Sequence, residues 1–163
     1  MDYWTVNSTD TDHEIWMTLT LSDESYASWG TDGNRGAYWG VTFGNQMDDV
    51  DCILCQVSWR GPSSNNNVIT CNDYWSETEA LPPLDSQQDV TTNSTAFSSD
   101  TVARTVFLSA TFHRKFDTGD SDKDTALGGG EQELSYAHGQ LFNGVKTAHS
   151  ASDSGDGFMI DIL

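Results

Sequence analysis

One methionine stands apart among the residues of this chain that can bind a metal. Met47 lies in the polar sequence Gly-Asn-Gln-Met-Asp-Asp, directly after an apolar segment flanked by glycines. A thioether in a polar loop is not an obvious core residue, whereas Met17 and Met159 occupy apolar, strand-like positions. A thioether and an imidazole form a known axial pair for haem iron, but residue type alone does not choose Met47 over the other two.

The candidate imidazole partners are the histidines, which are His13, His113, His138 and His149. Any of them can equally be an ordinary surface residue. No histidine pair and no second Cys-x-x-Cys pair completes a zinc site. The chain has no Gly-x-Ser-x-Gly segment, which argues against a serine nucleophile.

An aspartate-rich segment, F-D-T-G-D-S-D-K-D, carries Asp117, Asp120, Asp122 and Asp124. Its composition resembles a calcium loop. Its spacing does not match the EF-hand pattern, however, and no glutamate closes it. We therefore expect a turn with solvated carboxylates.

Three cysteines offer a different kind of chemistry. Cys52 and Cys55 are spaced Cys-x-x-Cys, but Gln56 follows them, so the signature of covalent haem attachment is missing. Two apolar segments, 51–57 and 68–74, flank a turn-rich loop and predict a hairpin. A hairpin centred near residue 63 places Cys55 opposite Cys71, which predicts a cross-strand disulfide and leaves Cys52 free or paired between chains. A Cys52–Cys71 bridge and three free thiols are the alternatives.

Charge limits the partners of the chain. Acidic residues outnumber basic residues by 25 to 7, which gives a formal net charge of −18. Such a chain cannot neutralise a run of phosphates, so nucleic acid is excluded as a partner, and an anionic membrane surface is disfavoured. A cationic partner is favoured. The chain has no apolar run long enough to span a bilayer.

The elements that must position these residues read as strands. From His13 to Leu21, every second residue is apolar, which is the period of a half-buried strand. Further strands are expected over 37–44, 101–116, 133–138 and 157–163, in addition to the hairpin. The polar stretch 77–100 is expected to be a long surface loop with one short strand. Helix signals are almost absent, so the chain is predicted to be a single all-β sandwich domain covering residues 1–163.

The order of several segments resembles one family, the DOMON domains, and within it the branch that binds haem b as a cytochrome. The stretch Arg114-x-x-Asp-Thr-Gly-Asp, followed later by Tyr-Ala-x-Gly, is the most specific part of the resemblance, which covers nearly the whole chain. The matching segments are W-T-V-N at 4–7, I-W-M-T-L-T-L at 15–21, Y-W-G-V-T-F-G-N-Q-M-D-D-V-D at 38–51, F-H-R-K-F-D-T-G-D-S-D-K-D at 112–124, L-S-Y-A-H-G at 134–139, V-K-T-A-H-S at 145–150 and G-D-G-F-M-I-D-I-L at 155–163.

The resemblance implies an immunoglobulin-like antiparallel β-sandwich with a non-covalent haem b in a pocket at one end. The family's axial methionine falls on Met47 and its axial histidine on His149, with His138 as the rival histidine. The same resemblance places Tyr38, Trp39 and Phe43 near Met47, where they would supply the apolar wall of the pocket. A structural role in the core is the equal alternative for these three aromatic residues.

An iron with both axial positions filled has no open position for oxygen or substrate. The resemblance therefore implies a one-electron transfer domain and not an enzyme in its own right. In relatives, the domain is fused to a transmembrane cytochrome b module or to a flavin dehydrogenase, and it is extracellular or lumenal. The expected partner is a redox protein or membrane cytochrome with a basic docking surface.

The alternative function is a carbohydrate-binding or other ligand-binding sandwich without haem. Trp29, Trp59 and Trp75 lie next to turn-like sequence, where they are candidates for a platform that stacks sugar rings.

Overall fold

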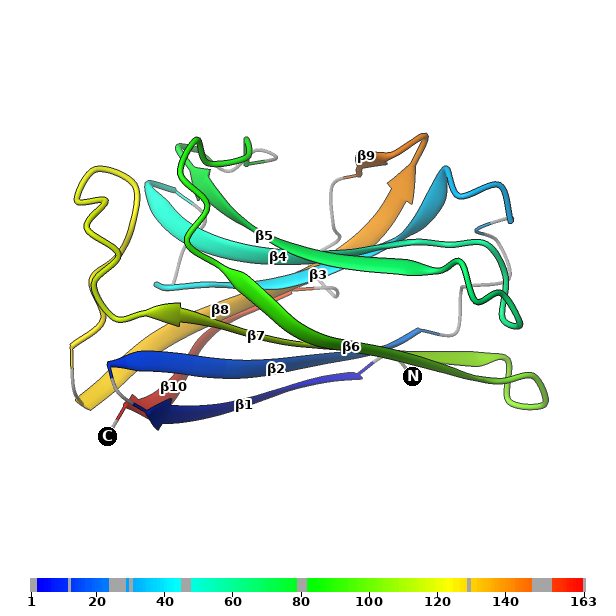
Figure 1. Cartoon of the computed structure of the whole chain (residues 1–163), viewed down its shortest axis with the longest axis horizontal. Helices are drawn as coiled ribbons and strands as arrows, with labels where there is room; N and C mark the ends of the chain where they lie inside the picture. The colour runs from blue at the N-terminus through cyan, green and yellow to red at the C-terminus, as the bar shows by residue number, and fades with distance from the viewer. Residues whose placement is uncertain are drawn as a thin grey trace.

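The computed structural model is built from antiparallel strands, and the residues that it describes contain no helix (Figure 1). It describes residues 3–11, 13–23, 29, 31–44, 48–78, 82–128, 130–147 and 154–162. The strands are β1 (Tyr3–Thr11), β2 (Glu14–Asp23), β3 (Arg35–Thr42), β4 (Val50–Ser58), β5 (Val68–Ser76), β6 (Thr91–Asp100), β7 (Thr105–Lys115), β8 (Gly130–Phe142), β9 (Val145–Lys146) and β10 (Ser154–Ile162).

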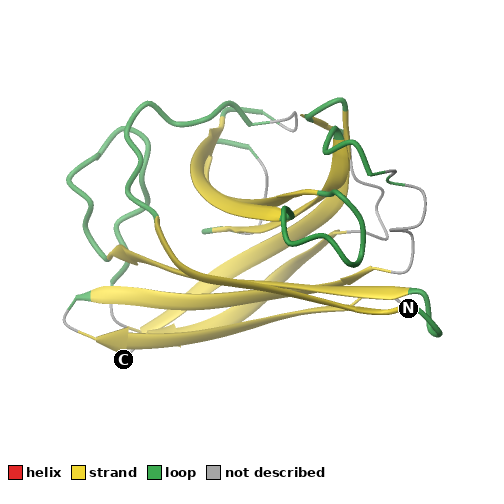
Figure 2. Ribbon diagram, turned by 45° about the vertical axis from the view of Figure 1, so that its right-hand side comes forward, coloured by secondary structure: helices red, strands yellow, loops and turns green. Residues whose placement is uncertain are grey.

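The strands form two sheets that pack face to face (Figures 1 and 2). One sheet has four strands in the order β1-β2-β7-β6. The other has six, in the order β10-β8-β3-β4-β5, with the short β9 paired to β8. The two sheets confirm the predicted all-β sandwich. The described residues include no helix that could cross a membrane.

The core lies between the two sheets. On β2, Ile15, Met17, Leu19 and Leu21 share one face and are each at most 1% exposed. On β7, the neighbour of β2 in the same sheet, the side chains on this face are also fully buried; they belong to Val106, Leu108, Ala110 and Phe112. Since successive side chains of a strand point to opposite faces, the period-two pattern read from the sequence fixes which face is buried.

The predicted hairpin is present as β4 and β5, with Cys55 directly opposite Cys71. These two cysteines form the disulfide, which confirms the expected register. A bridge that closes a loop of this length stabilises the fold by about 3 kcal/mol in the chain-entropy account. Cys52 is a free thiol, fully buried, and it donates a hydrogen bond to the carbonyl oxygen of Tyr74 at 3.3 Å. The free thiol is one of the two outcomes expected for Cys52.

The polar stretch 77–100 contains more strand than expected. The polar stretch expected to be mostly loop contains β6, which pairs with β7 along its whole length. The sequence of β6 shows no apolar alternation because β6 is an edge strand, mostly exposed, and only Phe97 packs against the core. Conversely, β7 begins at Thr105, since residues 101–104 form a turn.

Candidate functional site

The six-stranded sheet is covered on both faces, although the second sheet can cover only one. On β3, every residue from Gly36 to Thr42 is buried. Trp39 and Val41 belong to the core between the sheets. Tyr38 points to the opposite face because side chains alternate along a strand, and yet it is only 4% exposed. We call this opposite side the outer face.

A second apolar cluster lies on the outer face of the neighbouring strands. It consists of Cys52, Leu54 and Tyr74, separate from the main core. Ala137 and Leu141 of β8 are also buried on this side. The outer face is therefore an apolar surface that the rest of the chain keeps from water.

Two glycines leave room for the side chains of Tyr38 and Leu54 on this surface. A Cβ atom added at Gly139 would stand 2.7 Å from the Tyr38 hydroxyl oxygen, so the Tyr38 ring crosses directly over β8. A Cβ atom added at Gly40 would stand 2.3 Å from the Leu54 Cδ2 atom. Both distances are too short for a residue with a Cβ atom, so side chains cross the strands at these two positions. We call the apolar outer surface of β8, β3, β4 and β5 the apolar floor.

The chain segment after β8 folds back over this floor. The Tyr38 hydroxyl donates a hydrogen bond to the Thr147 carbonyl oxygen at 2.7 Å, and the Thr147 amide donates to the Gln140 carbonyl oxygen at 2.9 Å. The Lys146 ammonium lies 3.8 Å from the centre of the Tyr74 ring, which is a cation–π contact. Figure 1 shows β9 on the side of this sheet that faces away from the four-stranded sheet.

A second segment begins at the other end of the same floor. The Gly44 carbonyl oxygen accepts hydrogen bonds from the Thr42 hydroxyl at 3.1 Å and from the Ser135 hydroxyl at 2.8 Å. Tyr38 and Thr42 are four residues apart on β3, which corresponds to about 13 Å along a strand. The two β3 residues that hold these segments, Tyr38 and Thr42, therefore lie on one face of the strand, at opposite ends of the floor.

The two anchored residues, Gly44 and Thr147, lie close in the sequence to the two predicted iron ligands. Met47 lies three residues beyond Gly44, and His149 lies two residues beyond Thr147. Both ligands lie outside the described residues. The structure places Gly44 and Thr147, which precede the two ligands in the sequence, at opposite ends of the apolar floor.

The other predicted site residues divide between the two faces of the sheet. Tyr38 lies on the outer face, beside the anchored segments. Trp39 and Phe43 pack in the core between the sheets, 2% and 4% exposed. His138 is half-buried and directly opposite Trp39, so it shares the inner side with Trp39.

The aspartate-rich segment is only partly as expected. Asp117 and Asp122 are exposed, in agreement with a solvated turn. Asp124 differs: it lies beside the buried carboxylates of Asp51 and Asp73. Sequence reasoning missed this group because its three members are far apart in the chain and each strand position looks unremarkable alone.

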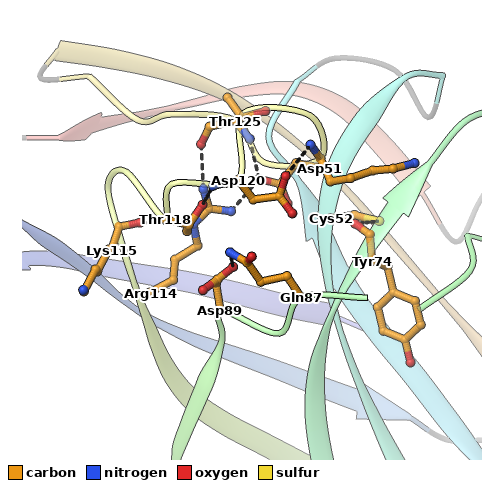
Figure 3. A network of polar contacts seen from close by, with 11 residues as sticks. Asp51, Cys52, Tyr74, Gln87, Asp89, Arg114, Lys115, Thr118, Asp120 and Thr125 are labelled. Atoms are coloured by element: carbon orange, nitrogen blue, oxygen red, sulfur yellow. Dashed lines mark hydrogen bonds and ion pairs between the residues drawn. The ribbon is translucent and has the colours of Figure 1, made fainter. Parts of the chain in front are cut away.

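Arg114 of β7 joins this inner group to the core. Its guanidinium forms a fully buried ion pair with Asp51 and donates a hydrogen bond to the Thr125 carbonyl oxygen at 2.6 Å (Figure 3). The same guanidinium lies 4.8 Å from the centre of the Phe43 ring. The one sequence signal was an arginine on the apolar face of β7, where a charge needs a buried partner.

The tryptophan platform is wrong. Trp29 and Trp59 are each 1% exposed and contact one another edge to face, with ring centres 5.4 Å apart. Trp75 is half-buried, and the Lys123 ammonium lies 5.6 Å from its ring centre. Turn-like sequence beside a tryptophan did not mean exposure, because large rings fill the ends of the sandwich core.

Fold and site together define an antiparallel β-sandwich domain with an apolar floor on the outer face of its larger sheet. The DOMON domain profile matches residues 11–139, and the chain belongs to the DOMON domain family. No curated protein matches the sequence.

Two solved structures share the fold. The cytochrome domain of Myriococcum thermophilum cellobiose dehydrogenase is 14% identical, with a TM-score of 0.52, over 99% of this chain and 74% of that one. The cytochrome b domain of pyranose dehydrogenase from Coprinopsis cinerea is 13% identical, with a TM-score of 0.55, over 98% of this chain and 76% of that one.

Proposed function

We propose that this domain is a one-electron transfer module that binds haem b non-covalently, with Met47 and His149 as the axial ligands. The observation that carries the proposal is the outer face: the segments leading to both ligands are anchored at opposite ends of one apolar floor. The similarity in fold to two cytochrome domains supports it.

The residues at hand fit a haem. Leu54, Tyr74 and Ala137 of the apolar floor offer the apolar contacts that a macrocycle needs. A thioether and a neutral imidazole are both suitable donors for haem iron. When bound, haem supplies one-electron oxidation and reduction, while the protein tunes the potential through the ligands and the dryness of the pocket.

The described residues hold the ligand segments and exclude water. Tyr38 fixes the chain at Thr147, and the hydroxyls of Thr42 and Ser135 fix it at Gly44. When haem is bound, supporting hydrogen bonds of this kind would help to hold its ligands in place. No bond to a substrate is made or broken, and the domain acts with a partner oxidoreductase or membrane cytochrome.

Charge and redox chemistry complete the proposal. A formal charge of −18 favours a partner with a basic docking surface. Asp48 and Asp49 are exposed and directly follow Met47, which makes them candidates for the rim that meets the partner. The Cys55–Cys71 disulfide suits an extracellular or lumenal location.

Absorption spectra of three variants test the ligands. Oxidised and dithionite-reduced wild-type protein should show the sharp bands of low-spin haem. Met47→Ala and His149→Ala should each convert the haem to high spin or lose it, while His138→Ala, the matched control, should leave the spectrum unchanged. Loss of the spectrum in His138→Ala alone would show that the histidine is misassigned. Absence of bound haem in the wild-type protein would overturn the function itself.

A further inference from the structure

Three carboxylates from distant parts of the chain meet inside the sandwich. Asp51 comes from β4, Asp73 from β5, and Asp124 from the segment between β7 and β8. Each offers one oxygen, and the three oxygens lie within 4.8 Å of one another. Asp51 and Asp73 are 0% and 1% exposed, and Asp124 is half-buried.

Oxygens in this group lack hydrogen-bond partners among the described residues. They are Oδ1 of Asp51, both carboxylate oxygens of Asp73, and Oδ2 of Asp124. Oδ2 of Asp85, which lies near Asp73, is also buried without a partner. An unpartnered buried carboxylate is costly, so a group of them must be neutralised, either by a cation or by protons.

The surroundings orient these carboxylates without satisfying them. Oδ2 of Asp51 accepts hydrogen bonds from Arg114 and from the Thr125 amide, the latter at 2.9 Å (Figure 3). Oδ1 of Asp51 has no hydrogen-bond partner among the described residues. Gln88 accepts from the Asp73 amide at 3.0 Å and donates to the Asp73 carbonyl oxygen at 2.9 Å. The side chain of Asp73 is therefore held in place through its backbone, while both of its oxygens stay available.

Charge within the cluster is unbalanced. Arg114 compensates one of the three carboxylates, which leaves two negative charges for a divalent cation to neutralise. Burial, together with the charges of Asp51 and Asp124, raises the pKa of Asp73 to about 8. Burial also raises the pKa of Asp51 to about 6, against the opposing effect of Arg114.

We propose that Asp51, Asp73 and Asp124 bind a structural calcium ion that joins β4, β5 and the segment between β7 and β8. Calcium takes six to eight oxygen ligands at about 2.3–2.6 Å, so oxygens that share one ion can lie up to roughly 5 Å apart. The second oxygen of Asp73, which also lacks a hydrogen-bond partner among the described residues, can add to the three. Magnesium is smaller, keeps several waters, and is seldom held in a cage made only of protein atoms.

Thermal unfolding of the full chain, with calcium or with chelator, tests this site. A ligand that binds only the folded state raises the melting temperature. Calcium should raise it for the wild-type protein and for the control Asp122→Asn, which loses the same charge from an exposed position in the same segment. Asp73→Asn and Asp124→Asn should lose the calcium response. Since Asp124 is only half-buried, its variant keeps the test available if Asp73→Asn does not fold.

Calorimetric titration of calcium into chelator-treated protein gives the second readout. One site per chain is expected, absent in Asp124→Asn and present in Asp122→Asn. No binding to the wild-type protein, or equal binding to Asp124→Asn, would overturn the site. Binding of magnesium with no binding of calcium would overturn the choice of ion.

Discussion

Two sites of different chemistry share the same pair of strands. On β4, Cys52 faces the outer apolar floor, while its neighbour Asp51 faces the inner carboxylate cluster. On β5, Tyr74 and Asp73 divide in the same way. Alternation along a strand separates an apolar surface from a charged one by a single residue. A substitution in the inner cluster should therefore mainly change the free energy of unfolding, whereas a substitution on the outer floor should mainly change the haem spectrum.

The largest effect is expected from Arg114→Met. It removes the only described cation paired with Asp51 and leaves a buried carboxylate uncompensated, which costs about 3–5 kcal/mol. Urea unfolding measures the change in the free energy of unfolding.

Lys123→Met is the control, because the Lys123–Glu77 ion pair is largely exposed and such pairs contribute about 0–1 kcal/mol. The double variant Arg114→Met/Asp51→Asn should recover part of the loss. Equal losses in the free energy of unfolding for the two single variants would mean that the buried Arg114–Asp51 pair stabilises the fold no more than the exposed pair does.

A smaller effect, on the outer face, is expected from Gly139→Ala. The added methyl group would meet the Tyr38 ring, and overpacking of this kind costs about 1–3 kcal/mol. Because Tyr38 anchors Thr147, the haem spectrum should shift as well. Gly128→Ala is the matched control, since a Cβ there has no neighbour within 4 Å. An unchanged spectrum in Gly139→Ala would separate Tyr38 from the haem site.

The pH dependence of stability separates the inner cluster from the outer floor. In chelator, folded Asp73 keeps its proton up to its raised pKa of about 8, whereas the unfolded chain releases it near 3.8. Between these values the folded state binds more protons. The free energy of unfolding should therefore fall with rising pH, by up to about 1.4 kcal/mol per pH unit for this group. Asp73→Asn should flatten the curve, and a wild-type curve that rises with pH would contradict the assignment.

The smallest expected effect is kinetic and leaves stability unchanged. Charge steers a basic electron acceptor toward the domain, and salt screens this attraction over about 8 Å at physiological ionic strength. The double variant Asp48→Asn/Asp49→Asn should flatten the salt dependence of the second-order rate constant, measured by stopped flow. The control Asp117→Asn/Asp122→Asn should keep it. Equal salt slopes in the two double variants would mean that the acidic rim is not the docking surface.

Local patterns were enough to predict most of the fold. The alternation in β2 and the turn between β4 and β5 fixed strand faces and even the Cys55–Cys71 register. They failed at β6, where an edge strand needs no apolar face, and at Trp29 and Trp59, whose burial depends on distant packing.

The candidate sites were less accessible to sequence reasoning. The carboxylate cluster depends on which residues a sandwich brings together, and no local spacing encodes Asp51 beside Asp124. The resemblance to cytochrome domains named Met47 and His149, but the close contacts at Gly139 and Gly40 on the apolar floor are seen only in the packing of neighbouring strands.

Near-infrared magnetic circular dichroism of the oxidised protein is the most direct test of the central claim, because the energy of the ferric haem charge-transfer band identifies the axial pair. We expect the band of methionine–histidine ligation in the wild-type protein, and its loss in Met47→Ala. A band typical of two histidine ligands, or of high-spin haem, would contradict it.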